Sequence, residues 1–119
     1  MSTQSFKNII AWQKAADLAV LVYRDFKECK DYSFRDQIQR ATISISNNIA
    51  EGYAKRSDKA FRNYLMIAKG SCAEVESMLI IAERLDYLTV SQHKDLIEHT
   101  EEVGKIISGF AKKLQAKDY

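Results

Sequence analysis

No proline occurs in this chain of 119 residues, and glycine occurs only four times. A β-sandwich or an α/β domain of this size needs many tight turns, which proline and glycine often supply. The scarcity of both residues therefore predicts a few long helices joined by short connections. The length suffices for one compact domain, which we expect to extend over residues 1–119, and is too small for two.

Apolar residues recur at steps of three and four along four segments, which predict helices at about 8–29, 34–54, 58–85 and 91–115. Short connections make successive helices antiparallel, so the predicted fold is all-α, an up-down-up-down four-helix bundle. We expect Ser33 and Ser57 to cap the second and third helices, and Thr89 or Ser91 to cap the fourth. The third helix carries an uninterrupted apolar stripe of Phe61, Tyr64, Leu65, Ala68, Cys72, Val75, Leu79, Ala82 and Leu85.

The segment 40–52 in the second helix is rich in β-branched residues, yet its apolar residues keep the helical period. Its polar residues form a second stripe, so the helix is expected to pack against more than one neighbour. An active site is one interpretation of this stripe, but no metal or nucleophile motif accompanies it. We favour hydrogen bonds between helices or a subunit interface. Whether Arg40 and Glu51 pair within or between subunits stays open. The residues of this predicted interface or buried polar set are Ser44, Asn48, Glu51, Gly52 and Gly70, the two glycines permitting close helix packing or marking a local irregularity.

The formal net charge is only +2, but it is unevenly distributed. Residues 1–72 carry twelve Lys or Arg and seven Asp or Glu, whereas residues 73–119 carry six and nine. A basic cluster follows the second helix, and its only acid is Asp58. If the segment is taken as helical, four of its cations form one stripe: Lys55, Lys59, Arg62 and Lys69. Such a stripe suits contact with a nucleic-acid backbone. A merely solvated face is the alternative. The candidate nucleic-acid-binding residues are Lys55, Arg56, Lys59 and Arg62, with Lys69 and Arg40 as weaker candidates.

Metal and nucleophile motifs are missing from the sequence. Di-metal bundles need Glu-x-x-His pairs, but the residues three before His93 and His99 are Val90 and Leu96. We expect both histidines to be solvated. No glycine-rich phosphate loop is present, and the two cysteines are expected to be reduced thiols. The sequence therefore predicts no catalytic residue, no metal site, no cofactor and no enzyme activity. Without a signal-peptide core or a long apolar run, we expect a cytoplasmic protein with no membrane partner.

Three segments resemble one family. Residues 37–41 (QIQRA) and 44–52 (SISNNIAEG) are similar to the second-helix signature of bacterial four-helix bundle proteins called intervening-sequence proteins, which are encoded within insertions in large-subunit ribosomal RNA genes. Residues 11–15 (AWQKA) and 68–76 (AKGSCAEVE) resemble the motifs of the first and third helices. Ser46 stands where the family commonly has proline, a change that removes a helix kink and no functional group.

The resemblance implies an antiparallel bundle that assembles as a homo-oligomer. Related members, including the accessory variability determinant of diversity-generating retroelements, form homopentamers with a basic surface. That relative binds nucleic acid and partners a reverse transcriptase, so the resemblance suggests RNA, DNA or such a protein as partners. Our first hypothesis is a non-enzymatic, oligomeric bundle that binds RNA or DNA non-specifically. The alternatives are a protein-interaction scaffold and, less favoured, a small enzyme that uses Glu51 and Arg40.

Overall fold

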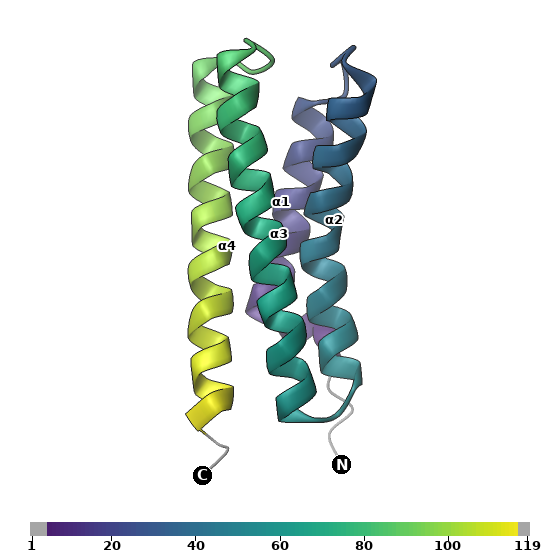
Figure 1. Ribbon diagram of the computed structural model, residues 1–119, viewed down its shortest axis with the longest axis vertical. Helices are drawn as coiled ribbons and strands as arrows, with labels where there is room; N and C mark the ends of the chain where they lie inside the picture. The colour runs from purple at the N-terminus through teal and green to yellow at the C-terminus, as the bar shows by residue number, and fades with distance from the viewer. Residues whose placement is uncertain (1–4, 117–119) are drawn as a thin grey trace.

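The computed structural model describes residues 5–116 and within them contains four α-helices, one short 3-10 helix and no strand. The helices run alternately up and down and form a rod of 48 × 24 × 22 Å (Figure 1). Each helix packs against its neighbours in sequence, and α4 closes the ring against α1. The predicted up-down-up-down four-helix bundle is confirmed. The elements are η1 (Phe6–Asn8), α1 (Ile10–Asp25), α2 (Tyr32–Ala54), α3 (Asp58–Arg84) and α4 (Val90–Ala116).

The core is a column of apolar side chains to which every α-helix contributes one stripe. These side chains are withdrawn from water completely or almost so, which provides the main driving force for folding. The largest of them are Leu18, Val22, Phe26, Ile38, Ile45, Ile49, Leu65, Val75, Leu79, Leu96, Val103 and Ile107.

Two helix starts agree with the expected caps, and one differs. Ser57 Oγ accepts a hydrogen bond from the backbone N–H of Ala60 (3.2 Å) and caps α3. Thr89 caps α4, because its Oγ1 accepts a bond from the N–H of Gln92 at 3.0 Å. In α2 the cap is Asp31, two residues before the predicted Ser33, and the helix therefore begins earlier than expected.

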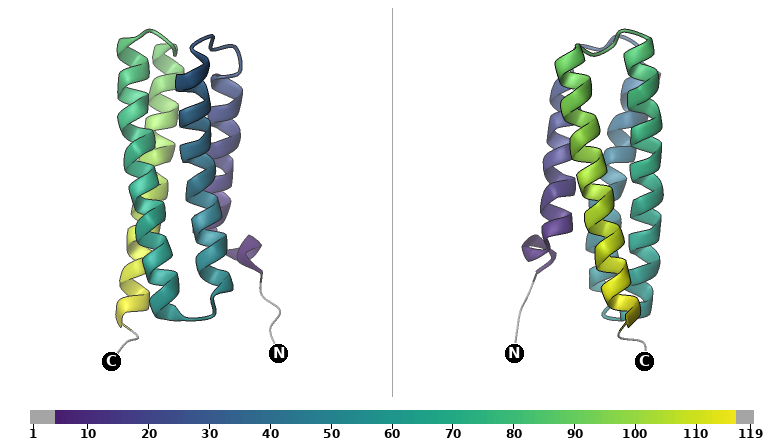
Figure 2. Two further views of the ribbon diagram at one scale, coloured as in Figure 1. Left: turned by 45° about the vertical axis from the view of Figure 1, so that its right-hand side comes forward. Right: turned by 90° about the vertical axis from the view of Figure 1, so that its left-hand side faces the viewer.

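The first helix is shorter at both ends than the predicted 8–29. The backbone is extended at Ile9, and the chain before it forms η1, which packs against α1 and α2 (Figure 2). Phe6 lies edge-on against Trp12, with ring centroids 5.0 Å apart. The side-chain amide of Gln13 donates a hydrogen bond to the carbonyl of Lys7 (2.8 Å). These contacts hold η1 to one side of the bundle, and α1 begins after it, at Ile10.

Candidate nucleic-acid interface

The basic cluster lies at a bend, where α2 ends and α3 begins. Lys55 is the C-cap of α2, and Arg56 lies in the connection with a left-handed φ of 59°. Lys59 and Arg62 lie in the first two turns of α3. The prediction of one helical stripe that includes Lys55 is therefore wrong, because the chain reverses direction between Lys55 and Lys59. The bend nevertheless keeps these cations together at one end of the bundle, and all but the half-buried Arg62 are exposed.

Neighbouring side chains shape this cluster. The ammonium of Lys55 lies 5.8 Å from the centre of the Tyr64 ring, within the range of a cation–π contact. Arg62 lines a shallow hollow of about 380 Å³ between α3 and α4, together with Met66 and Lys112. A second helix thus contributes a cation next to the cluster.

The two weaker candidates lie apart from the bend. Lys69 lies two turns further along α3, and its Nζ donates a hydrogen bond to Ser108 Oγ on α4 (2.5 Å). Arg40 is exposed on α2, fifteen residues before Lys55, which corresponds to about 22 Å along a helix. The structure therefore does not bring Arg40 to the cluster, and it engages Lys69 with α4.

Charge is strongly separated along the bundle axis. When each helix is divided at its middle, one half consists of residues 5–17, 44–70 and 104–116, and it contains the α2–α3 connection (Figure 1). This half, called the basic end below, has ten Lys or Arg against three Asp or Glu, a net charge of +7. The other half has seven against twelve, a net charge of −5. The candidates predicted from the sequence did not include Lys7, Lys112 and Lys113, which the fold brings to this end.

Part of the polar stripe of α2, Ser44 with Asn48, lies at the contact with α3. Ser44 Oγ and Ser71 Oγ are 3.0 Å apart, so one hydroxyl donates to the other across the two helices. The side-chain amide of Asn48 donates to the carbonyl (2.8 Å) and to the hydroxyl (3.0 Å) of Ser44 and thereby orients it. Further along the same seam, the Gln37 amide donates to a carboxylate oxygen of Glu74 at 2.6 Å. Ser44 and Asn48 thus form part of a hydrogen-bonded seam between helices.

Glu51 and Arg40 are both exposed, and neither forms an ion pair within the part of the chain that the structure describes. Eleven residues separate them on one helix, which corresponds to about 16 Å along its axis. This distance is too long for a direct pair within one subunit. The two residues therefore do not form a joint site in the single chain.

The two predicted packing glycines differ. Gly52 is buried, and a Cβ added to it would lie 2.5 Å from Cβ of Tyr64 on α3, so only glycine fits this close contact. A Cβ added to Gly70 would meet no atom within 4 Å in the described part of the chain. Gly70 is exposed on α3, and two half-exposed side chains, Met66 (48%) and Ile67 (53%), lie one turn before it. The packing of one chain therefore does not require glycine at position 70.

The two histidines and the buried cysteine of the described range lie in separate environments. His93 is more buried than predicted, with 17% of its side chain exposed, and its Nε2 lies 3.5 Å from Glu83 Oε2. His99 Nε2 lies 3.5 Å from Asp95 Oδ1. Burial raises the pKa of the Cys72 thiol to about 11, which keeps it protonated and unreactive near neutral pH. Among residues 5–116 no group of three or more His, Cys, Asp or Glu could hold a metal ion.

Fold and surfaces together define a small helical bundle with a basic end and a hydrogen-bonded seam between its second and third helices. The chain belongs to the 23S rRNA-intervening sequence protein family, whose model matches residues 7–109. This match includes all three motif segments and confirms the family resemblance seen in the sequence. None of the helices in the described range has an apolar run long enough to cross a bilayer.

A solved structure to which this chain is similar matches over nearly its whole length. It is the crystal structure of a protein of unknown function from the S23 ribosomal protein family of Bacteroides thetaiotaomicron VPI-5482. The TM-score is 0.81 at 28% sequence identity, and the match covers 87% of this chain and 99% of that one. No functionally curated protein matches the chain.

Proposed function

We propose that the protein is a non-enzymatic nucleic-acid-binding protein whose basic end contacts the phosphate backbone of RNA or DNA without sequence specificity. The separation of charge carries this proposal, since a net +7 is concentrated in one half of a nearly neutral chain. Phosphate contacts need several convergent cations and no base-reading groups. The two free cysteines are compatible with a reducing compartment, and we place the protein in the cytoplasm.

Lys55, Arg56 and Lys59 are the main proposed phosphate ligands, because they are exposed and meet at one bend. Arg62 continues this surface toward α4, where Lys112 extends it. Lys69 contributes less because Ser108 already engages its ammonium, and Arg40 contributes least because it lies far from the bend. Non-specific binding of this kind depends on the number of contacts more than on any single residue.

Fluorescence anisotropy with a labelled DNA duplex and a labelled RNA hairpin, at increasing salt concentrations, tests the proposal. With four phosphate contacts, the slope of log K against log salt is roughly −3.6 for a duplex. The double variant Lys55→Glu/Lys59→Glu should bind at least about tenfold more weakly and with a shallower slope. Lys27→Glu/Lys30→Glu makes the same charge change on exposed residues at the opposite end and should bind almost normally. Undetectable affinity, a flat salt dependence, or equal losses in both variants would contradict the proposal.

Assembly into a homo-oligomer, a pentamer by family resemblance, forms part of the same proposal. The exposed face of α3 supports it, because Met66 and Ile67 leave apolar surface in water beside the open position of Gly70. Arg40 and Glu51, too far apart to pair within one chain, are available to pair between chains. Size-exclusion chromatography with light scattering should give a mass of several subunits.

Ile67→Glu should dissociate this oligomer, because it introduces a charge into the apolar face of α3. Val20→Glu is the matched control, since Val20 on α1 is also exposed (68%) but lies on another helix. A monomer at all concentrations, or dissociation by Val20→Glu alone, would refute this part of the proposal.

A protein-interaction scaffold is the second candidate function. The apolar face of α3 continues to Ile80 and Ile81, each nearly half exposed, and this surface favours a protein partner such as a reverse transcriptase. In that case the basic end is merely solvated. Flat salt titrations together with an intact oligomer would favour this second function over nucleic-acid binding.

A further inference from the structure

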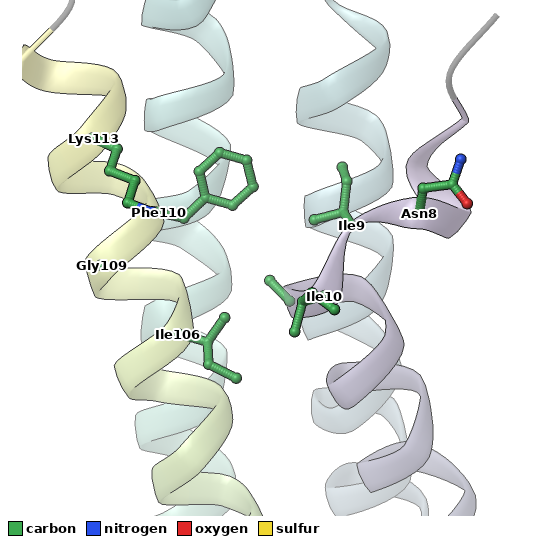
Figure 3. Close-up of a pocket in the computed structure, with 8 residues that line it drawn as sticks. Asn8, Ile9, Ile10, Ile106, Gly109, Phe110 and Lys113 are labelled. Atoms are coloured by element: carbon green, nitrogen blue, oxygen red, sulfur yellow. The ribbon is translucent and has the colours of Figure 1, made fainter.

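An apolar groove lies between the beginning of α1 and the last turns of α4. Its volume is about 460 Å³, and most of its lining is apolar. Ile106 and Phe110 on α4 face Ile9 and Ile10 across it (Figure 3). Lys113 lines the groove on α4, one turn beyond Gly109. Ile10 is 57% exposed, so the groove leaves apolar surface in contact with water.

The groove exists because α1 is shorter than α4. Next to the groove the two helices are joined by an ion pair, with Lys14 Nζ 3.8 Å from Glu102 Oε2. One turn further, α1 begins at Ile10, and the chain before it forms η1, which packs against α1 and α2. The last three turns of α4, roughly 15 Å, therefore continue without the helix that covers the rest of it. The groove occupies the place of this absent helical segment.

Gly109 gives the groove a second distinctive feature. It lies in the interior of α4, where glycine is less favourable than alanine, and a Cβ added to it would meet no atom of residues 5–116 within 4 Å. The packing of one chain therefore does not explain this glycine. Glycine is well suited to a position where another backbone approaches closely. Beside it, Phe110 packs edge-on against Phe61 at 5.1 Å, so this wall of the groove is fixed by the core.

We infer that this groove binds an acidic amphipathic helix of a partner protein. Apolar side chains at positions i, i+3 or i+4, and i+7 of that helix fill the space between Ile10 and Phe110, as in other helix-in-groove complexes. Its acidic side chains face Lys113 and the surrounding basic end, whose net charge is +7. A helix of about three turns matches the uncovered length of α4. The inference does not depend on nucleic-acid binding, whose main proposed contacts, Lys55, Arg56 and Lys59, lie at the bend between α2 and α3.

A labelled synthetic peptide provides the test. The probe is a helix of about three turns with leucine at i, i+3, i+4 and i+7 and glutamate at the exposed positions. Fluorescence anisotropy with the full chain should give a dissociation constant on the order of 10 μM. The same peptide with lysine in place of glutamate should bind at least about tenfold more weakly, because like charges then meet at the basic end.

Three variants test the site itself. Gly109→Leu fills the groove and should weaken binding at least about tenfold, whereas Gln115→Leu, on an exposed position of the same helix outside the groove, should not. Lys113→Glu should shift the binding preference from the glutamate peptide toward the lysine peptide. Because Lys113 is exposed, this variant should fold normally. Circular dichroism confirms that each variant keeps its helices.

Several outcomes would overturn the inference. Equal binding of the acidic and basic peptides would indicate adsorption to any apolar surface. Full binding by Gly109→Leu would exclude the groove as the site. A change of oligomeric mass in Gly109→Leu would identify a second copy of the chain as the occupant. Loss of peptide binding in Lys55→Glu/Lys59→Glu, equal to the loss in Lys113→Glu, would show general attraction to the basic end.

Discussion

Gly52 lies at a close contact between α2 and α3, and its replacement by alanine tests that contact directly. A Cβ at this position would lie 2.5 Å from Cβ of Tyr64 and 3.0 Å from Cδ1 of Phe61. The phenylalanine ring can rotate slightly, but the Tyr64 atom is bonded to the backbone of α3 and moves only with that helix. Gly52→Ala should therefore separate the two helices locally and lower the stability of the fold.

The expected loss can be estimated from two opposing effects. Overpacking a buried site costs roughly 1–3 kcal/mol, and the rigid Tyr64 contact places this case near 3 kcal/mol. The better helix propensity of alanine offsets about 1 kcal/mol of that cost. The free energy of unfolding should fall by about 2 kcal/mol. With an unfolding entropy of about 2.1 cal/mol/K per residue, this lowers the Tm of a chain of 119 residues by about 8 °C.

Thermal unfolding followed by circular dichroism, at matched protein concentration, measures this shift. Gly109→Ala is the control, because it makes the same change inside α4, where the added Cβ meets none of the described residues within 4 Å. It should stabilise the protein by about 0.5–1 kcal/mol and raise Tm by about 2–4 °C. The reasoning fails if Gly52→Ala melts at or above the wild-type temperature, because α2 and α3 then do not approach as described.

Two further predictions concern ionisable groups. The hydroxyl of Tyr87 donates a hydrogen bond to Asp31 Oδ2 (2.6 Å), and this bond lowers the pKa of the Asp31 carboxyl. Tyr87→Phe removes the bond. The bond therefore stabilises the fold above the unfolded pKa of about 3.9, and its contribution disappears as the pH falls through the folded pKa. Urea unfolding should show a weaker variant at about pH 7 and little difference from wild type at about pH 2. For the thiols, Ellman's reagent at about pH 8 should modify the half-buried Cys29 first and Cys72 only after unfolding, since burial raises the pKa of Cys72. Equal rates for both thiols would contradict the packing of α3.

Helical periodicity was enough to predict the bundle, because each helix buries a stripe that its own sequence defines. In α3, seven of the nine predicted stripe residues are buried. Tyr64 is half-buried, and Leu85 is 48% exposed because it lies at the C-cap, beyond the last turn. Prediction was therefore best inside helices, where spacing alone decides the direction of a side chain.

Helix ends and surface features depended on contacts that local sequence does not encode. Asp31 and Ser33 are both suitable caps, and Asp31 receives a further hydrogen bond from Tyr87 in the distant α3–α4 connection. The sequence predicts the basic cluster at Lys55–Arg62 because its cations are close together in the chain. Lys7 and Lys112 lie at the same end of the bundle only because the helices alternate in direction. The groove beside α4 follows from the contact of η1 with α1 and α2, which the sequence pattern does not reveal.

The separation of charge along the bundle gives the molecule a large electric dipole moment although its overall charge is nearly zero. In the field of a polyanion such a rod experiences a torque that turns its basic end toward the polyanion before any contact forms. Ionic strength should then change the association rate more than the dissociation rate. The same asymmetry should make the protein adsorb to both cation and anion exchangers at one pH. A uniformly neutral rod of 48 Å would bind to neither.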